Sequence, residues 1–251
     1  MMGTAAGLAA AGKIPFASTF AHFAAGRAFD QIRNSIAYPK LNVKICPTHA
    51  GVSLGEDGGS HQSVEDIALM RSLPGMVVLS PADAVETEQM IFAVAEYNGP
   101  VYVRLGRLNV PVIFDESYEF EIGKGTVMIE GNDVAIIATG LLVYEAMKAS
   151  EALAEKGIKA RVINMSTIKP LDEKIVLEAA KECKFVVTCE EHSIVGGLGG
   201  AVTEYLSGTH PTKVIRHGIK DVFGQSGEGD QMLDEYKLRA KDIVEVVLQN
   251  M

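Results

Sequence analysis

Short apolar segments alternate with amphipathic segments along the whole chain, and this alternation constrains the fold more than any other feature. Most of the short segments are β-branched and apolar on both faces, as strands buried in a parallel sheet must be. They predict strands at Val43–Cys46, Val77–Ser80, Val101–Leu105, Val134–Thr139, Ala160–Asn164, Phe185–Cys189 and Lys213–His217. Helices are expected between them, at Ser63–Arg71, Ala84–Glu96, Val143–Glu155, Asp172–Cys183, Gly199–Leu206 and Ala240–Gln249. The pattern predicts βαβ units, and therefore an α/β fold built from doubly wound, mostly parallel sheets.

One segment breaks this rhythm and divides the chain. The residues from Pro111 to Met128 are acidic and lack helical periodicity, so we place a linker there. The first domain is then residues 1–112 and the second is residues 126–251. At the start of the chain, the small apolar residues from Gly3 to Gly12 predict a buried helix.

The charge balance excludes some classes of partner. The chain has 23 Lys and Arg against 32 Asp and Glu, a net charge of −9, which argues against binding to nucleic acid or to a membrane surface. No apolar run approaches the roughly 18 residues of a membrane span. The three cysteines, Cys46, Cys183 and Cys189, are odd in number and form no CxxC pair. They fit reduced thiols and a cytoplasmic location better than a disulfide framework.

The densest polar stretch is the loop that follows the first predicted strand, from Thr48 to Gln62. It carries four glycines and two histidines, a large polar load for a loop next to a buried strand. In one interpretation it binds substrate, with His49 and His61 as hydrogen-bond donors or acid–base groups and Asp57 as a polar anchor. The other interpretation is a solvated surface loop without such a role.

Two phenylalanines and two arginines can each be interpreted in two ways. Phe20 and Phe23 lie three residues apart, on one face if the segment is helical, and are either core aromatics or a wall for a planar ring. The segment Arg104–Arg107 ends a predicted strand, so its arginines either hold a phosphate or form salt bridges at the rim. The Gly196–Gly200 run is a tight strand-to-helix turn or, less simply, an anion site at a helix N-terminus.

Taken together, the motifs of the chain resemble those of transketolases. The resemblance rests on the segments Phe16–Phe23, Arg27–Arg33, Thr48–His49, Gly55–Gln62, Arg71–Gly75 and Ser80–Asp83. It extends over essentially the whole chain and matches a pyrimidine-binding domain followed by a transketolase C-terminal domain. Many bacteria and archaea encode transketolase as two chains, and this sequence is similar to the C-terminal one.

The resemblance implies an activity and a set of site residues. Transketolases use thiamine diphosphate and a divalent metal to move a two-carbon ketol unit from a ketose phosphate to an aldose phosphate. By this resemblance, Phe20 and Phe23 form the wall against the aminopyrimidine ring. His49 and His61 face the reacting carbons of the sugar, Asp57 holds a substrate hydroxyl, and Arg107 binds the substrate phosphate.

The resemblance also implies a partner. The diphosphate and its Mg²⁺ or Ca²⁺ are expected on an N-terminal transketolase subunit, so no metal site is expected in this chain. The active site then lies between chains, in a homodimer or heterotetramer, and the isolated polypeptide is expected to be inert.

Two features depart from the family pattern. Many transketolases have a third aromatic three residues after the second, where this chain has Gly26. The family also has a glutamate that activates the cofactor, just before the segment corresponding to Met1–Gly3. No residue of this chain matches it, so we expect the sequence to be truncated at its N-terminus relative to a full C-terminal subunit.

Two other functions stay open on the sequence. One is another thiamine-dependent enzyme with the same two domains, either the beta subunit of a 2-oxo-acid dehydrogenase or deoxyxylulose-phosphate synthase. Consumption of pyruvate would favour these, and consumption of xylulose 5-phosphate would favour transketolase. The other is a non-catalytic interaction module in which the second domain alone is stable.

Overall fold

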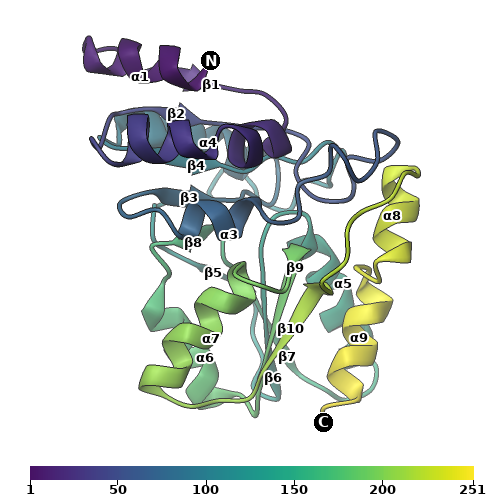
Figure 1. Cartoon of the computed structure of the whole chain (residues 1–251). Coiled ribbons are helices and arrows are strands. Elements are labelled where there is room, and N and C mark those ends of the chain that lie inside the picture. The colour runs from purple at the N-terminus through teal and green to yellow at the C-terminus, as the bar shows by residue number, and fades with distance from the viewer.

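The computed structural model describes all 251 residues and has two layers of α/β structure, one above the other (Figure 1). Each layer is built on a five-stranded sheet. The strand order is β1-β2-β4-β3-β8 in the first sheet and β10-β9-β6-β7-β5 in the second. The two termini lie at opposite ends of the molecule.

The first half of the chain contributes four short strands and six helical segments. They are α1 (Met2–Ala10), β1 (Phe16–Ala17), the π-helical segment η1 (His22–Arg27), α2 (Phe29–Gln31), a second π-helical segment η2 (Ile32–Ala37), β2 (Lys44–Ile45), α3 (Asp66–Arg71), β3 (Val77–Leu79), α4 (Ala84–Glu96) and β4 (Val101–Val103).

The second half has longer strands. Its elements are β5 (Thr126–Ile129), β6 (Val134–Ala138), α5 (Leu142–Ala154), β7 (Ala160–Asn164), β8 (Thr167–Lys169), α6 (Glu173–Glu182), β9 (Val186–Ser193), α7 (Leu198–Thr209), β10 (Val214–Ile219), α8 (Gly229–Glu235) and α9 (Ala240–Leu248).

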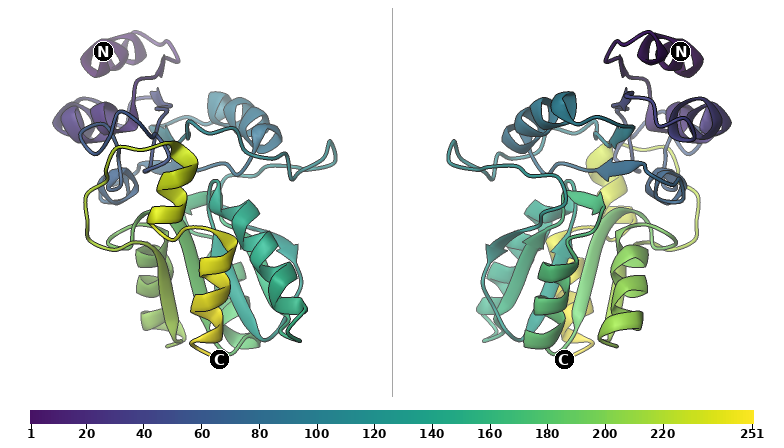
Figure 2. Two further views of the ribbon diagram at one scale, coloured as in Figure 1. Left: turned by 90° about the vertical axis from the view of Figure 1, so that its right-hand side faces the viewer. Right: turned by 90° about the vertical axis from the view of Figure 1, so that its left-hand side faces the viewer.

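Both sheets are covered by helices on both faces, which explains why most residues of their central strands are apolar and buried. In β6, Val134, Ile136 and Ala138 pack against α5 and α9. The alternate residues Ala135 and Ile137 pack against α6 and α7 on the other face. Figure 2 shows this layering around the second sheet. The predicted fold class, two doubly wound and mostly parallel sheets, is confirmed.

The structure corrects three expectations about elements. The helix expected at residues 3–12 is α1 (Met2–Ala10), but it buries only Met2, Ala5 and Ala6 and is otherwise at the surface. The helical stretch from His22 to Ala37, which includes two π-helical segments, was not predicted. Strands β1, β5 and β8 and helix α8 were also missed, and β5 begins inside the linker expected at Pro111–Met128.

Strand β8 comes from the second half of the chain but belongs to the first sheet. It pairs antiparallel with β3, with Thr167 opposite Leu79 and Lys169 opposite Val78. The residues between β4 and β5 form no helix or strand, and part of this segment reaches out from the body of the molecule (Figure 2). The two layers are therefore joined by strand pairing as well as by the covalent connection.

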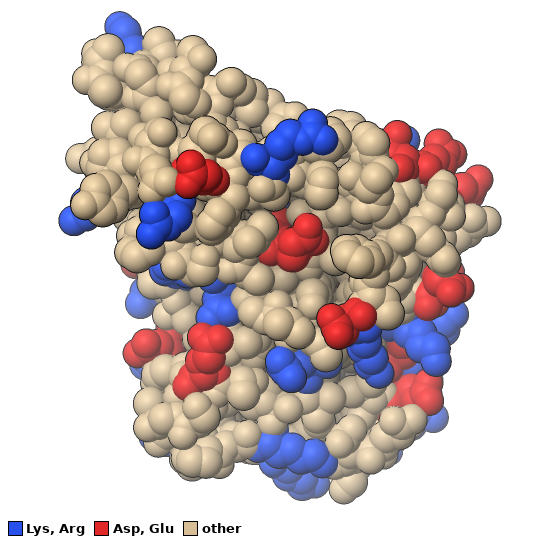
Figure 3. Space-filling model, in the orientation of Figure 1, with Lys and Arg blue, Asp and Glu red and all other residues tan.

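Charged side chains are mixed in sign over the face seen in Figure 1. Lys and Arg alternate with Asp and Glu there, and several acidic side chains gather at the upper right, in the region of α8 (Figure 3). None of the helices has both the length and the apolar character that crossing a membrane requires.

Candidate active site

Four of the residues singled out in the sequence form one aromatic cluster at the carboxyl end of the first sheet. Phe20 pairs with Thr48 as an isolated parallel bridge just beyond β1 and β2, which brings it beside His49. The Phe20 and His49 rings stack, with centroids 4.0 Å apart and planes 14° apart. Phe23 lies edge-on to His61 at 5.1 Å. We call Phe20, Phe23, His49 and His61 the aromatic cluster.

The two phenylalanine rings are parallel, although not for the reason that spacing suggested. Their planes differ by 3° and their centroids lie 6.0 Å apart. Phe23 is in η1, but Phe20 precedes that helix, so the pair does not share a helical face. Both rings are only partly buried, and the Arg27 guanidinium carbon lies 4.4 Å from the Phe23 centroid. A core-only role for these aromatics is therefore wrong.

His49 is held in a strained backbone conformation. Its φ is 62°, in the left-handed region that residues other than glycine rarely adopt. Its Nδ1 lies 2.8 Å from the hydroxyl of Thr48. Burial, and then the positive charge of Arg107, lower the pKa of His49, against an opposing effect of Asp57. The His49 imidazole is thus neutral near pH 7, and both charged neighbours act on it.

The remaining predicted site residues lie around this cluster. Asp57 is exposed on the polar loop (residues 48–62), and His61 Nδ1 lies 3.0 Å from the hydroxyl of Ser60. Arg107 is exposed, donates a hydrogen bond from Nη1 to the carbonyl of Leu54, and forms no ion pair. The rim salt bridge considered for Arg107 is therefore absent, and its guanidinium faces the loop.

Arg104, in contrast, is a structural residue. Its side chain is 6% exposed, and its Nε donates to Asp66 Oδ2 at 2.9 Å. The same carboxylate oxygen accepts a 2.9 Å hydrogen bond from Tyr102, and Arg104 Nη2 donates to the Glu191 carbonyl. Because this charge is buried and paired, it joins the two layers rather than binding a substrate.

The backbone N–H groups at the glycine-rich turn of residues 196–200 bind a side chain of the same protein. The carboxylate of Glu190 accepts hydrogen bonds from the backbone N–H groups of Leu198 and Gly199, at 2.7 and 2.8 Å, at the start of α7. A Cβ at Gly197 would collide with this carboxylate. Burial raises the pKa of Glu190 to about 7. The N–H groups at this helix N-terminus are thus already occupied by the chain's own glutamate, which leaves them unavailable to an external anion.

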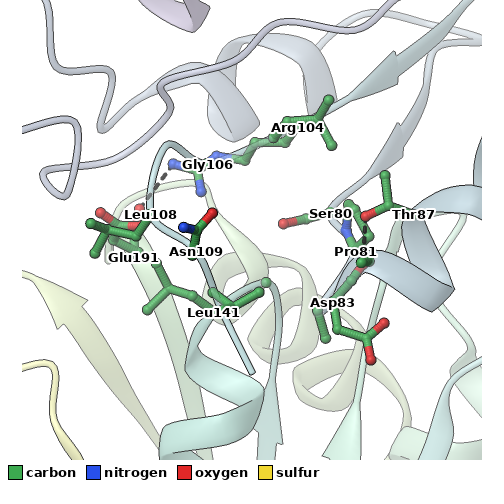
Figure 4. Close-up of a pocket in the computed structure, with 15 residues that line it drawn as sticks. Ser80, Pro81, Asp83, Thr87, Arg104, Gly106, Leu108, Asn109, Leu141 and Glu191 are labelled. Carbon is green, nitrogen blue, oxygen red and sulfur yellow. Dashed lines mark hydrogen bonds between the residues drawn. The ribbon is translucent and has the colours of Figure 1, made fainter. Parts of the chain in front are cut away.

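A separate cavity of about 410 Å³ lies between the layers (Figure 4). Its lining includes Ser80, Asn109 and Leu141, together with parts of Arg104 and Glu191. No residue of the aromatic cluster lines it. The cluster is instead on the surface, where a second chain can cover it.

The aromatic cluster fits one part of thiamine diphosphate. Two parallel, partly exposed phenyl rings suit the stacking of an aromatic pyrimidine ring. The open backbone at Gly26, where a Cβ would meet only His22 at 3.8 Å, leaves the position of the family's third aromatic unfilled. No group of three or more His, Cys, Asp or Glu side chains is close enough to hold a metal ion.

Sequence reasoning missed the residues that support the polar loop. Gln62 is buried beside His61 and donates to the carbonyls of Val52 and Gln225, and Ser226 donates to the carbonyl of Glu56. Gln62 is the last residue of the Gly55–Gln62 motif, so its place in that motif could have marked it as a residue of the site. Nothing local marks Ser226, because its partner lies 170 residues away in the sequence.

Comparison with protein families assigns both halves of the chain. Residues 1–112 match the model of the transketolase pyrimidine binding domain, and residues 123–243 match the model of the transketolase C-terminal domain.

Individual relatives agree with this assignment. A candidate transketolase C-terminal section of Methanocaldococcus jannaschii is 52% identical over 100% of this chain and 79% of that protein. The 6-deoxy-6-sulfo-D-fructose transketolase subunit SqwH of Clostridium sp. is 44% identical, over 97% of this chain and 76% of its own length. A solved structure described as a split gene transketolase, inactive beta4 tetramer, superposes with a TM-score of 0.93 at 52% identity, covering 99% of this chain and 80% of that one.

Proposed function

This chain belongs to the transketolase family, and from that premise we propose that it is the C-terminal subunit of a split, thiamine-diphosphate-dependent transketolase. With an N-terminal subunit it moves a two-carbon ketol unit from a ketose phosphate to an aldose phosphate. The observation that carries the proposal is the aromatic cluster, in which His49 is close enough to Asp57 and Arg107 for both charges to act on it.

Each residue of the site has a defined task in this proposal. Thiamine diphosphate supplies the electron sink that allows the carbon–carbon bond of the ketose to be broken and remade. Phe20 and Phe23 orient its pyrimidine ring by stacking. His49, neutral near pH 7, and His61 hold or move protons at the hydroxyls of the sugar next to the bond that changes.

Substrate recognition falls to the two charged residues beside the cluster. Asp57 accepts a hydrogen bond from a sugar hydroxyl. Arg107 binds the terminal anion of the sugar, for which a guanidinium that forms no ion pair is suited. The first candidate for this anion is the phosphate of a ketose phosphate. The similarity to SqwH makes a sulfonated ketose the second candidate donor, because a guanidinium pairs with either group.

The partner completes the site. The N-terminal subunit provides the ligands of the diphosphate and of its Mg²⁺ or Ca²⁺, and the assembly is a homodimer or a heterotetramer. The isolated chain is inert, and the enzyme works in the cytoplasm on phosphorylated sugars of central carbohydrate metabolism, including the pentose phosphates.

The test is a donor panel on the reconstituted enzyme. This subunit, with and without an added upstream segment that supplies the cofactor-activating glutamate, is mixed with the N-terminal subunit from the same source, thiamine diphosphate and magnesium. The assembly is offered xylulose 5-phosphate, a 6-sulfonated ketose or pyruvate, with ribose 5-phosphate as acceptor. Transfer from xylulose 5-phosphate supports the proposal, and preference for the sulfonated ketose selects the second donor. Consumption of pyruvate would instead indicate a synthase or a dehydrogenase subunit.

A further inference from the structure

The polar loop has little internal structure to fix its shape. Gly51, Gly55 and Gly58 all have positive φ, and no helix or strand lies within residues 48–62. Its internal hydrogen bonds are short-range, such as those from the N–H groups of His61 and Gln62 to the carbonyl of Gly58. Such a loop samples several conformations unless another part of the molecule holds it.

A segment of the second layer lies directly on this loop. After β10 the chain runs up to the first layer before α8 begins (Figure 2). We call residues 223–229 the clamp. A Cβ at Gly59 would collide with the carbonyl oxygen of Gly224, and a Cβ at Gly229 would lie 2.6 Å from the Ser53 carbonyl oxygen. The two backbones are therefore in contact at both ends of the clamp.

Two side-chain hydrogen bonds fasten the clamp to the loop. Ser226 Oγ donates to the Glu56 carbonyl at 2.6 Å, and Gln62 Nε2 donates to the Gln225 carbonyl at 3.0 Å. Gln62 is 3% exposed and also donates to the Val52 carbonyl at 2.9 Å. A Cβ at Gly224 would collide with the Gln62 carboxamide, so the clamp leaves no room for another side chain there.

These two hydrogen bonds lie directly beside the two residues of the loop that are expected to face the substrate. Glu56 precedes Asp57, and Gln62 follows His61, so the bonds fix both ends of the segment that carries the two substrate-facing groups. We propose that the clamp of the C-terminal domain positions Asp57 and His61 for catalysis, with Ser226 and Gln62 as positioning residues. The roles of Asp57 and His61 in this inference rest on the proposed function. The contact between the clamp and the polar loop is observed independently of that function.

The experiment compares Ser226→Ala with Ser226→Thr and with Ser207→Ala. The threonine keeps the hydroxyl. Ser207 is a matched control, because it is also an exposed serine of the second layer whose hydroxyl donates to one carbonyl, that of Glu204 at 2.9 Å. Loss of one neutral hydrogen bond is expected to raise amide exchange of residues 55–62 in Ser226→Ala by about three- to tenfold. Ser226→Thr and Ser207→Ala should exchange as the wild type does.

Kinetics of the reconstituted enzyme separate positioning from a merely structural role. In Ser226→Ala, kcat/KM for the donor ketose should fall by about three- to tenfold. The affinity for thiamine diphosphate should be unchanged, because Phe20 and Phe23 lie outside the clamped segment, and Ser226→Thr should restore kcat/KM. Loss of cofactor affinity together with kcat/KM would overturn the positioning role.

Unchanged exchange of residues 55–62 in both Ser226→Ala and Gly224→Ala would overturn the clamp itself. If the wild-type assembly transfers no ketol unit at all, the proposed function fails. The exchange measurement still decides whether residues 223–229 hold the loop, so the two failures are distinguishable.

Discussion

Replacing Arg107 by alanine tests the assignment of the substrate-binding face most sharply. In the structure this guanidinium donates to the Leu54 carbonyl and forms no ion pair, and its charge reaches His49. A charge-assisted hydrogen bond to a sugar phosphate contributes about 1.5–3 kcal/mol. Since every 1.4 kcal/mol is a factor of ten, Arg107→Ala should raise KM for a phosphorylated ketose by about ten- to 150-fold.

The assay compares two donors and two variants. KM is measured for a ketose with and without its phosphate, in the reconstituted enzyme, and only the phosphorylated donor should show the increase. Arg216→Ala is the matched control, because Arg216 is also an exposed arginine whose Nη1 donates to a single carbonyl, that of Ile194 at 2.8 Å. An equal rise in KM for both donors, or an unchanged KM for the phosphorylated one, would refute the assignment.

Three further predictions concern titration and stability. Arg107→Ala should raise the pKa of His49, because the guanidinium now lowers it; an NMR titration of His49 that shows no upward shift would contradict this. Asp66→Ala leaves a buried guanidinium unpaired and should lower the free energy of unfolding by about 3–5 kcal/mol. Glu204→Ala, which breaks an exposed ion pair, should lower the free energy of unfolding by only about 0–1 kcal/mol. Equal urea midpoints for Asp66→Ala and Glu204→Ala would contradict the larger effect expected of the buried pair. The pKa of Glu190 is raised to about 7 from 4.5, so its protonated form stabilises the fold most at acidic pH, and this contribution is lost as pH rises from about 4.5 to 7. The stability of the wild type relative to Glu190→Gln should therefore fall between pH 5 and 7.5, and a constant difference in urea midpoints would show that Glu190 does not titrate there.

Local patterns predicted most elements of the second layer, although not β5 or α8. The strand at Val134–Ala138 and the Asp172 cap of α6 follow from β-branched runs and capping chemistry, which act over a few residues. The four residues of the aromatic cluster were singled out together through the resemblance to transketolase motifs, and not through spacing alone. Its geometry was not predicted, since Phe20 meets His49 through a bridge to Thr48 and not through a helix.

Long-range contacts account for what the sequence did not reveal. Strand β8 joins a sheet made by the other half of the chain, and Ser226 meets Glu56 across 170 residues. No local period encodes such pairings. The occupant of the Gly196–Gly200 turn was missed for the same kind of reason, because the motif points to an anion but not to Glu190 as its source.

The central claim is that this chain is one half of a two-chain transketolase. The most direct measurement is ketol transfer from xylulose 5-phosphate to ribose 5-phosphate, with thiamine diphosphate and magnesium present. The N-terminal subunit is titrated into a fixed amount of this one, which carries an added upstream segment that supplies the cofactor-activating glutamate. We expect no transfer by either subunit alone, and activity that rises to a plateau at equal amounts of the two. Transfer by this subunit alone, or no transfer at any ratio, would contradict it.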